Sequence, residues 1–171
     1  MQTELSMLDR FHFRLKSQHA CFAWVFAQMA DMQGPVFELG LGKGRTYDHL
    51  RRNQPGREIY VFERDVRPIE GCLPPDPYLV RGDIEVNLPV YVKRFEGKVA
   101  LVHSDVGDIS LAHNQMMREL VPRIAPPALM PGGFLLSDLN LEVPGFAQLP
   151  LPPDAVPGRY FIYRKPLTAG S

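Results

Sequence analysis

The sequence contains only two cysteines, Cys21 and Cys72, and they do not form a Cys-x-x-Cys pair. This disfavours a disulfide-stapled scaffold and a zinc ribbon, and a reducing compartment is the natural setting. An excess of basic residues is also missing, because 19 Lys and Arg residues balance 19 Asp and Glu residues. A protein that wraps nucleic acid needs such an excess to displace counterions. We therefore expect no nucleic-acid partner.

Long uncharged runs are absent as well. Nowhere do eighteen apolar residues follow one another without a charge, so no transmembrane helix is predicted. Charged residues interrupt the first thirty positions and leave no apolar core for a secretory signal. We therefore expect a cytoplasmic protein without a membrane partner.

The chain has 171 residues, of which 45% are hydrophobic and 22% are charged. This size and composition are those of one ordinary globular domain, which we expect to span residues 1–171. Prolines number 17, about twice their usual share of roughly 5%. Five of them lie in residues 144–158, which excludes an ordinary helix there.

Hydrophobic periodicity predicts an alternation of helices and strands. Residues 1–34 form an N-terminal helical extension, with a long helix over 5–31. The expected order continues with strand 36–39, helix 45–53, strands 58–62 and 78–80, helix 86–95, strand 98–103, helix 112–121, and strands 133–137 and 159–163. Such alternation predicts an α/β fold, with an open, mostly parallel, twisted sheet and helices on both faces. Only one late strand is visible, so we expect the sheet to be truncated after its fifth strand.

Acidic residues end all five of the main predicted strands. In open α/β sheets, ligands bind outside the carboxyl ends of the strands. The acidic residues at these ends are Glu38, Glu63, Asp83, Asp105 and Asp138. Together they would repel a phosphorylated ligand and favour one that carries hydroxyls, amines or positive charge.

The first strand runs into a glycine-rich turn that reads Glu38-x-Gly40-x-Gly42-x-Gly44. A dinucleotide-binding turn usually reads Gly-x-Gly-x-x-Gly, so the spacing differs here. The segment resembles motif I of the class I S-adenosylmethionine-dependent methyltransferases. Further segments fit the same family, over roughly residues 34–137: Glu63 after the second strand, Gly82-Asp83-Ile84 after the third, and Pro131-Gly132-Gly133 before the fifth.

The resemblance implies a Rossmann-like methyltransferase fold, S-adenosyl-L-methionine as the cofactor, and a role for each matching residue. Glu63 would bind both ribose hydroxyls, Asp83 and Ile84 would line the adenine, and Glu38 would face the ammonium group. The glycines would let the chain pass close under the methionyl part. The complete cofactor set that we expect is Glu38, Gly40, Gly42, Gly44, Thr46, Glu63, Arg64, Asp83, Ile84 and Ser104.

Asp105 and Asp138 are the expected catalytic residues, because such positions lie near the transferable methyl group in this family. They would accept a proton or orient the acceptor, and His103 is an alternative base. The two segments also resemble the catechol O-methyltransferase group, in which acidic strand ends hold Mg²⁺. That group has an adjacent Asp-Asn pair, whereas Leu139 separates Asp138 from Asn140 here. We therefore assign no metal site.

The sequence thus predicts a methyltransferase that acts on a small-molecule acceptor through oxygen or nitrogen. The [Asn/Asp]-Pro-Pro-[Tyr/Phe] motif of adenine methylation in nucleic acids is missing. Two alternatives stay open: an NAD(P)-dependent oxidoreductase, and a non-catalytic S-adenosylmethionine-binding protein. A homodimer that covers the truncated sheet edge is a further hypothesis.

Overall fold

The computed structural model describes residues 5–167. Its elements are α1 (Met7–Gln28), β1 (Val36–Leu39), α2 (Arg45–Asn53), β2 (Ile59–Glu63), β3 (Leu79–Arg81), α3 (Ile84–Arg94), β4 (Val99–Ser104), α4 (Leu111–Ile124), the 3₁₀ helix η1 (Pro126–Ala128), β5 (Leu129–Ser137), β6 (Ala147–Gln148) and β7 (Phe161–Arg164). None of the helices in this part of the chain combines the length and apolar character needed to cross a membrane.

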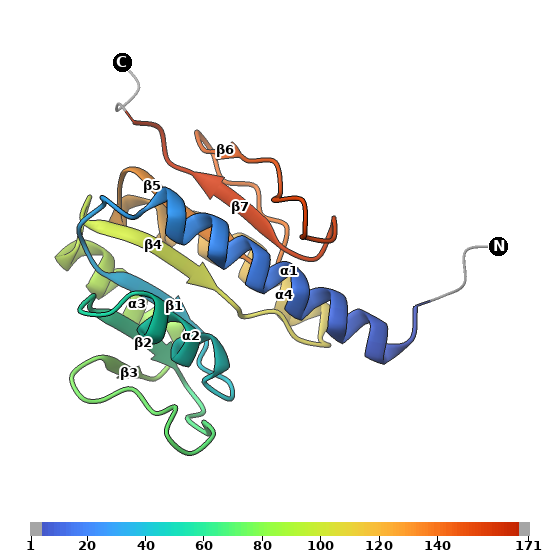
Figure 1. Ribbon diagram of the computed structural model, residues 1–171. Helices are drawn as coiled ribbons and strands as arrows, with labels where there is room; N and C mark the ends of the chain where they lie inside the picture. Colours follow the sequence, from blue (N-terminus) through green and yellow to red (C-terminus); the bar gives the residue numbers. More distant parts are fainter. Residues whose placement is uncertain (1–4, 168–171) are drawn as a thin grey trace.

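The strands form one sheet in the order β3-β2-β1-β4-β5-β7-β6 (Figure 1). The first five strands pair in parallel, and β7 runs antiparallel to both β5 and β6. The expected α/β fold class is confirmed. Because β1 and β2 lie between β3 and β4, the chain reverses its direction of winding beside β1, and this reversal creates a crevice at the strand ends.

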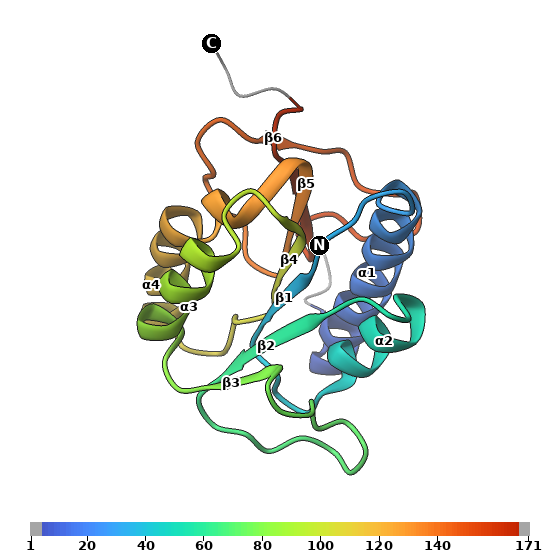
Figure 2. The ribbon, with the colours of Figure 1, turned by 90° about the vertical axis from the view of Figure 1, so that its left-hand side faces the viewer.

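Helices cover both faces of the sheet (Figure 2). Helices α1 and α2 lie on one face and α3 and α4 on the other. Each face has its own hydrophobic core, and all residues of β1 and β4 are buried between the two. Burial on both faces is the usual condition of central parallel strands. It explains why these strands read as apolar runs.

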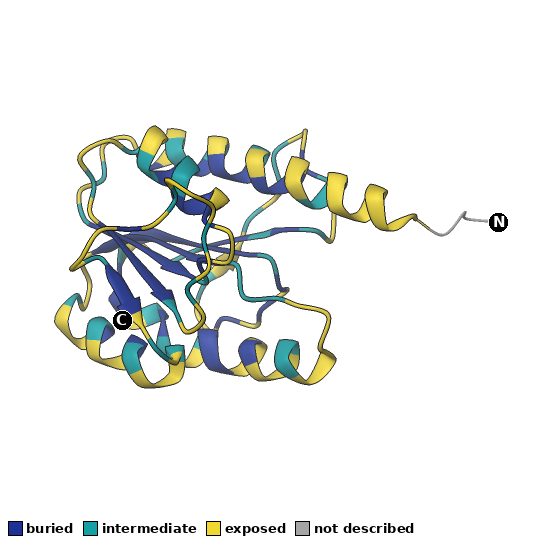
Figure 3. Ribbon diagram, turned by 90° about the horizontal axis from the view of Figure 1, so that it is seen from below, coloured by how far each residue is buried: buried dark blue, intermediate teal, exposed yellow. Residues whose placement is uncertain are grey.

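Helix α1 is capped at its start by a reciprocal pair of hydrogen bonds. The Ser6 hydroxyl accepts from the backbone N–H of Asp9, and the Asp9 carboxylate accepts from the backbone N–H of Ser6. Such a reciprocal pair is a capping box, which satisfies backbone N–H groups that would otherwise lack a partner at the helix start. The first turns of α1 extend past the rest of the molecule and are exposed on all sides (Figure 3).

The expected truncation after the fifth strand is not confirmed, because β7 and β6 extend the sheet beyond β5. Strand β6 has two residues, and Ala147 and Gln148 pair with Arg164 and Tyr163 of β7. Two residues inside a proline-rich segment are too few to show an alternating pattern, which is why the sequence did not reveal this strand. The segment contains no helix, as expected.

Candidate functional site

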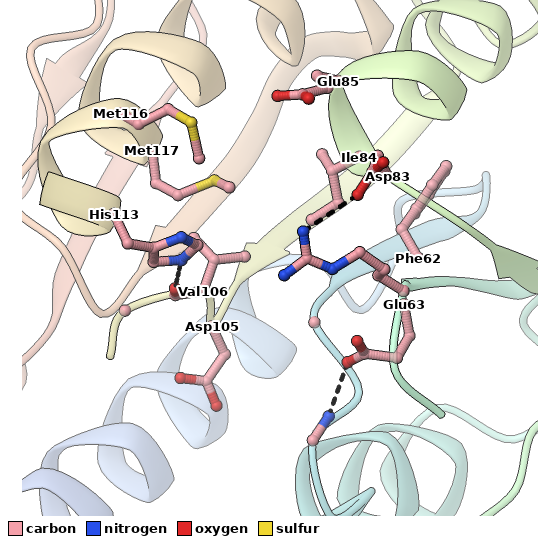
Figure 4. Close-up of a pocket in the computed structure, with 14 residues that line it drawn as sticks. Phe62, Glu63, Asp83, Ile84, Glu85, Asp105, Val106, His113, Met116 and Met117 are labelled. Carbon is pink, nitrogen blue, oxygen red and sulfur yellow. Dashed lines mark hydrogen bonds and ion pairs between the residues drawn. The ribbon is translucent and has the colours of Figure 1, made fainter. Parts of the chain in front are cut away.

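A cavity of about 240 Å³ opens at the carboxyl ends of β1, β2, β3 and β4. In Figure 4, Glu63, Asp83 and Ile84 lie on one side of this first cavity. His113, Met116 and Met117, on or near the first turns of α4, lie across from them, and Asp105 lies between the two sides. The cavity thus combines an apolar slot with carboxylates.

The Glu63 carboxylate holds the glycine-rich turn. Its Oε2 atom accepts hydrogen bonds from the backbone N–H groups of Leu41 and Gly42, at 2.8 and 3.1 Å. The other oxygen accepts from the Asp65 backbone N–H at 2.8 Å. A carboxylate has about four lone-pair sites. Three of them accept these backbone bonds, so one site remains, on Oε1. Glu63 therefore orders the turn and keeps one acceptor site for a hydroxyl donor.

Two glycines of the turn line the first cavity, and they differ in what surrounds them. Both have a positive φ, 89° at Gly40 and 51° at Gly42. A Cβ atom at Gly40 would lie 2.6 Å from the Asp105 backbone oxygen, whereas at Gly42 it would meet nothing within 4 Å. Gly40 thus allows β1 and β4 to approach closely, while Gly42 borders open space.

The first cavity also contains an ion pair at its mouth. The Arg64 guanidinium lies 3.3 Å from the Asp83 carboxylate, and both side chains are substantially exposed (Figure 4). Asp83 occupies the N-cap position of α3, but its side chain makes no capping hydrogen bond. Ile84 follows as the first residue of the helix. Asp83 is therefore held by Arg64 rather than by its own helix.

A second cavity of about 240 Å³ lies between α1 and the glycine-rich turn. Its α1 side consists of Phe11, Arg14, Leu15 and Gln18. It shares the lining residues Gly40, Gly42, Asp105 and Gly107 with the first cavity. The two cavities therefore meet at the ends of β1 and β4, and Asp105 lies at their junction.

Arg14 lies between the two candidate catalytic carboxylates. Its Nη2 atom donates to Asp105 Oδ1 and lies 3.5 Å from Asp138 Oδ2. Burial disfavours the charged guanidinium, but the charges of Asp105 and Asp138 outweigh this effect and raise the pKa of Arg14. The N-terminal helix thus supplies the cation that the two strand ends lack.

Asp138 is the more deeply buried of the two carboxylates, with 6% of its side chain exposed against 19% for Asp105. Its Oδ2 atom accepts from the Gly107 backbone N–H at 2.9 Å. Within residues 5–167, its Oδ1 atom is buried and has no hydrogen-bond partner. Burial, followed by the charge of Asp105, raises the pKa of Asp138 to about 6. Asp138 can therefore change its protonation state near neutral pH.

Four predicted cofactor residues do not line the first cavity. Glu38 and Ser104 are fully buried and line neither cavity. Gly44 is the N-cap residue of α2, and a Cβ there would lie 2.6 Å from the Cys72 Cβ. Thr46 borders only the second cavity and donates to Glu38.

The Glu38 carboxylate binds Thr46 and His103. In this structure, therefore, neither Glu38 nor His103 faces the cavities, although the sequence led us to expect it.

Several lining residues were not predicted from the sequence. Arg14 and Gln18 lie on α1, and Met116 and Met117 lie on α4. The one available signal was that Arg14 and Gln18 interrupt the apolar stripe of α1 on its inner side. Among residues 5–167, no group of three or more His, Cys, Asp or Glu side chains is arranged to hold a metal ion.

This geometry, a doubly wound sheet with acidic strand ends around a glycine-rich turn, is that of a nucleoside-binding α/β protein. Residues 5–165 match the family described as S-adenosyl-L-methionine methyltransferase. The chain belongs to this family. Membership decides against the NAD(P)-dependent oxidoreductase, and it makes S-adenosyl-L-methionine the cofactor and the protein a methyltransferase. No curated protein matches the chain.

Solved structures agree with this assignment. The crystal structure of an S-adenosyl-L-methionine methyl transferase from Silicibacter pomeroyi DSS-3 is similar at 46% identity and a TM-score of 0.91, over 95% of this chain and 99% of that one. The fold alone is shared with the antibiotic-resistance methyltransferase Kmr, at 14% identity and a TM-score of 0.52, over 84% and 92% of the two chains. It is also shared with the mycinamycin methyltransferase MycE, solved with Mg, SAH and mycinamycin VI, at 13% identity and a TM-score of 0.57, over 92% and 48%.

Proposed function

We propose that this protein transfers the methyl group of S-adenosyl-L-methionine to an oxygen or nitrogen atom of a small-molecule acceptor. The first cavity takes the adenosine part, with the ribose at Glu63 and the adenine between Ile84 and the α4 methionines. The second cavity takes the methionyl part and the acceptor. The methyl group is then transferred from the cofactor to the acceptor at Asp105, where the two cavities meet.

The chemistry of the lining residues supports this arrangement. S-Adenosyl-L-methionine carries a sulfonium and an ammonium but no phosphate, which suits strand ends that are acidic. In the first cavity the Arg64 cation is already paired with Asp83. The open space beside Gly42 leaves room for a ligand to pass close to the backbone. These features suit a ligand that is cationic and carries no phosphate.

Asp105 and Asp138 have different roles in this proposal. The bound cofactor supplies an electrophilic methyl group, and the acceptor must lose a proton from its O–H or N–H group. The Asp105 carboxylate stabilises the positive charge at the cavity junction. Asp138, whose pKa is raised to about 6, has the basicity that general-base catalysis at neutral pH requires. Alignment of the two reactants supplies a further part of the acceleration, on the order of 7–11 kcal/mol at best.

The observation that carries the proposal is the cluster formed by Arg14, Asp105 and Asp138. Asp105 lines both cavities and Arg14 lines the second. The buried Asp138 lines neither cavity, and its carboxylate lies 3.5 Å from the Arg14 guanidinium. To test the proposal, we would measure the release of S-adenosylhomocysteine in the presence of a library of small hydroxyl and amine acceptors. We expect acceptor-dependent release that Asp138→Asn abolishes. Release only with proteins or nucleic acids would contradict the proposed acceptor class.

Asp105 can be tested without an acceptor. S-Adenosylmethionine carries the sulfonium charge and S-adenosylhomocysteine does not, so a carboxylate beside the sulfur favours the former. We expect Asp105→Asn to lower the affinity for S-adenosylmethionine more than that for S-adenosylhomocysteine, by calorimetry. An equal change in both affinities would show that Asp105 does not face the sulfur.

We further propose that the protein works in the cytoplasm, since its thiols Cys21 and Cys72 are unpaired.

The homodimer stays a prediction. The truncated sheet edge that first suggested it is not present, because β6 and β7 extend the sheet. A second candidate surface is formed by exposed apolar side chains just before and within the first turns of α1: Leu5, Leu8, Phe11 and Leu15. Light scattering at high concentration measures the mass directly, and a monomeric mass would contradict the dimer.

A further inference from the structure

A chain of buried polar side chains lies directly behind the cavity junction. The Gln18 amide donates to the Tyr160 hydroxyl at 2.7 Å, and this hydroxyl lies 2.7 Å from His103 Nε2. On the other side of its ring, His103 binds Glu38, whose second oxygen accepts from Thr46. The chain therefore connects α1, the residue before β7, β4, β1 and α2.

All members of this chain are buried. Tyr160, His103 and Glu38 are fully buried, while Thr46 and Gln18 are 7% and 8% exposed. Burial disfavours a charged imidazole, but the Glu38 carboxylate outweighs this effect and raises the pKa of His103. Buried polar groups are costly unless every one is hydrogen-bonded, and a satisfied network makes the positions of its members well defined.

The chain ends on the carboxylate that lines both cavities. The same Gln18 nitrogen that binds Tyr160 also donates to Asp105 Oδ2 at 3.2 Å. The other oxygen, Asp105 Oδ1, accepts from Arg14. Two donors from α1 thus fix the two oxygens of Asp105, and the buried chain behind Gln18 fixes the position of one of these donors.

We propose that Tyr160 is a positioning residue, which holds the Gln18 amide, and through it the Asp105 carboxylate, in the orientation needed at the cavity junction. This inference rests on the proposed role of Asp105. It also gives Glu38 a role that differs from the expected one: Glu38 anchors the far end of the chain through His103 instead of contacting the ligand.

Tyr160→Phe tests the proposal, because it removes one hydroxyl and breaks the chain in the middle while keeping the ring. Tyr163→Phe is the matched control. The Tyr163 hydroxyl is also hydrogen-bonded, to Leu141 and Asn140, and its ring is 2% exposed. However, Tyr163 packs in the core on the α3 and α4 face of the sheet, whereas Tyr160 packs in the core on the other face.

The readout is the ratio of the affinities for S-adenosylmethionine and S-adenosylhomocysteine, measured by calorimetry. A general loosening of the fold would weaken both ligands alike. We expect Tyr160→Phe to lower the preference for S-adenosylmethionine by about fivefold, the effect of one misplaced hydrogen bond. Tyr163→Phe should leave the ratio unchanged. Gln18→Met breaks the chain from the α1 side and should reproduce the Tyr160→Phe result. If Tyr160→Phe does not fold, Gln18→Met tests the proposal in its place.

Two outcomes overturn the proposal in distinguishable ways. If Asp105→Asn lowers the preference but Tyr160→Phe and Gln18→Met do not, Tyr160 does not position Asp105, and the role of Asp105 stands. If Asp105→Asn leaves the preference unchanged, the role of Asp105 is wrong, and the positioning role fails with it.

Discussion

The guanidinium of Arg14 donates to the carboxylate of Asp105, which ties the N-terminal helix to the end of β4. Because α1 also lines the second cavity, the helical extension is part of the site and not only a cover for the sheet. Asp105 also accepts from Gln18, the first residue of the buried polar chain, and so connects Arg14 with that chain. The two cavities therefore combine strand ends that the sequence predicted with the helix residues Arg14 and Gln18, which it did not single out.

Arg14→Gln should lower the melting temperature of the unliganded protein, and more at pH 7.5 than at pH 5. Above the raised pKa of Asp138, two carboxylates face each other across Arg14, whereas below it Asp138 is protonated. Melts at both pH values measure the difference. Arg52→Gln, which breaks a surface pair with Asp48, is the control and should show a small loss at both pH values. An equal loss for Arg14→Gln at both values would contradict the account.

Asp138→Asn should stabilise the protein above pH 6 while it abolishes methyl transfer. A carboxyl whose pKa is raised on folding destabilises the folded state increasingly as the pH rises from its unfolded to its folded pKa. The cost is complete above the folded pKa and absent below the unfolded one. A shift from 3.8 to about 6 corresponds to at most about 3 kcal/mol. The asparagine oxygen can still accept from Gly107. Denaturant unfolding at pH 4 and pH 7.5 measures the gain, with the exposed Asp154→Asn as the control.

No gain in unfolding free energy at pH 7.5, or an equal gain at both pH values, would show that Asp138 is not strained by its burial.

Gly42→Ala should weaken the binding of S-adenosylmethionine, because its new methyl group enters the open space beside the turn. Gly56→Ala is a close control. Gly56 also has a positive φ, 79°, and a Cβ atom there would meet nothing within 4 Å, but it lies in the turn after α2. Both variants should lose about 1–2 kcal/mol of stability from the left-handed backbone. Only Gly42→Ala should lose affinity. Equal affinities in the two variants would place the ligand away from this turn.

Glu63→Gln should weaken the affinity for S-adenosylhomocysteine by about tenfold or more, because charge-assisted hydrogen bonds to the ribose become neutral ones. The structure also predicts a lower melting temperature without ligand, since Glu63 accepts from the Leu41, Gly42 and Asp65 backbone. Calorimetry and thermal melts measure the two effects, with the exposed Glu70→Gln as the control. Unchanged affinity would mean that the ribose does not bind at Glu63.

The sequence predicted the fold well where the pattern was long or strongly apolar. The central strands β1 and β4 are buried on both faces and therefore appear as uninterrupted apolar runs. The two-residue strand β6 has no such pattern, because its pairing depends on β7. Helix α4 continues past Pro122 to Ile124, although the proline predicted its end, because a proline removes only one hydrogen bond near the last turn.

The sequence placed Glu63, Asp83 and Asp105 at strand ends, and the structure has all three lining the first cavity. The sequence could not show in which direction a side chain points. Glu38 immediately precedes the glycine-rich turn in the same way as a ligand-facing residue would, but its carboxylate turns into the core toward His103. Nor could the sequence show that Arg14, 91 positions from Asp105, meets that residue, because this contact depends on the docking angle of α1.

The most direct test of the account is a crystal structure of the protein with S-adenosylhomocysteine. We predict that the ribose hydroxyls lie within hydrogen-bond distance of Glu63, that the adenine lies between Ile84 and Met117, and that the sulfur lies beside Asp105. A nucleoside bound at any other part of the molecule, with the strand ends of β1, β2 and β4 left free, would contradict it.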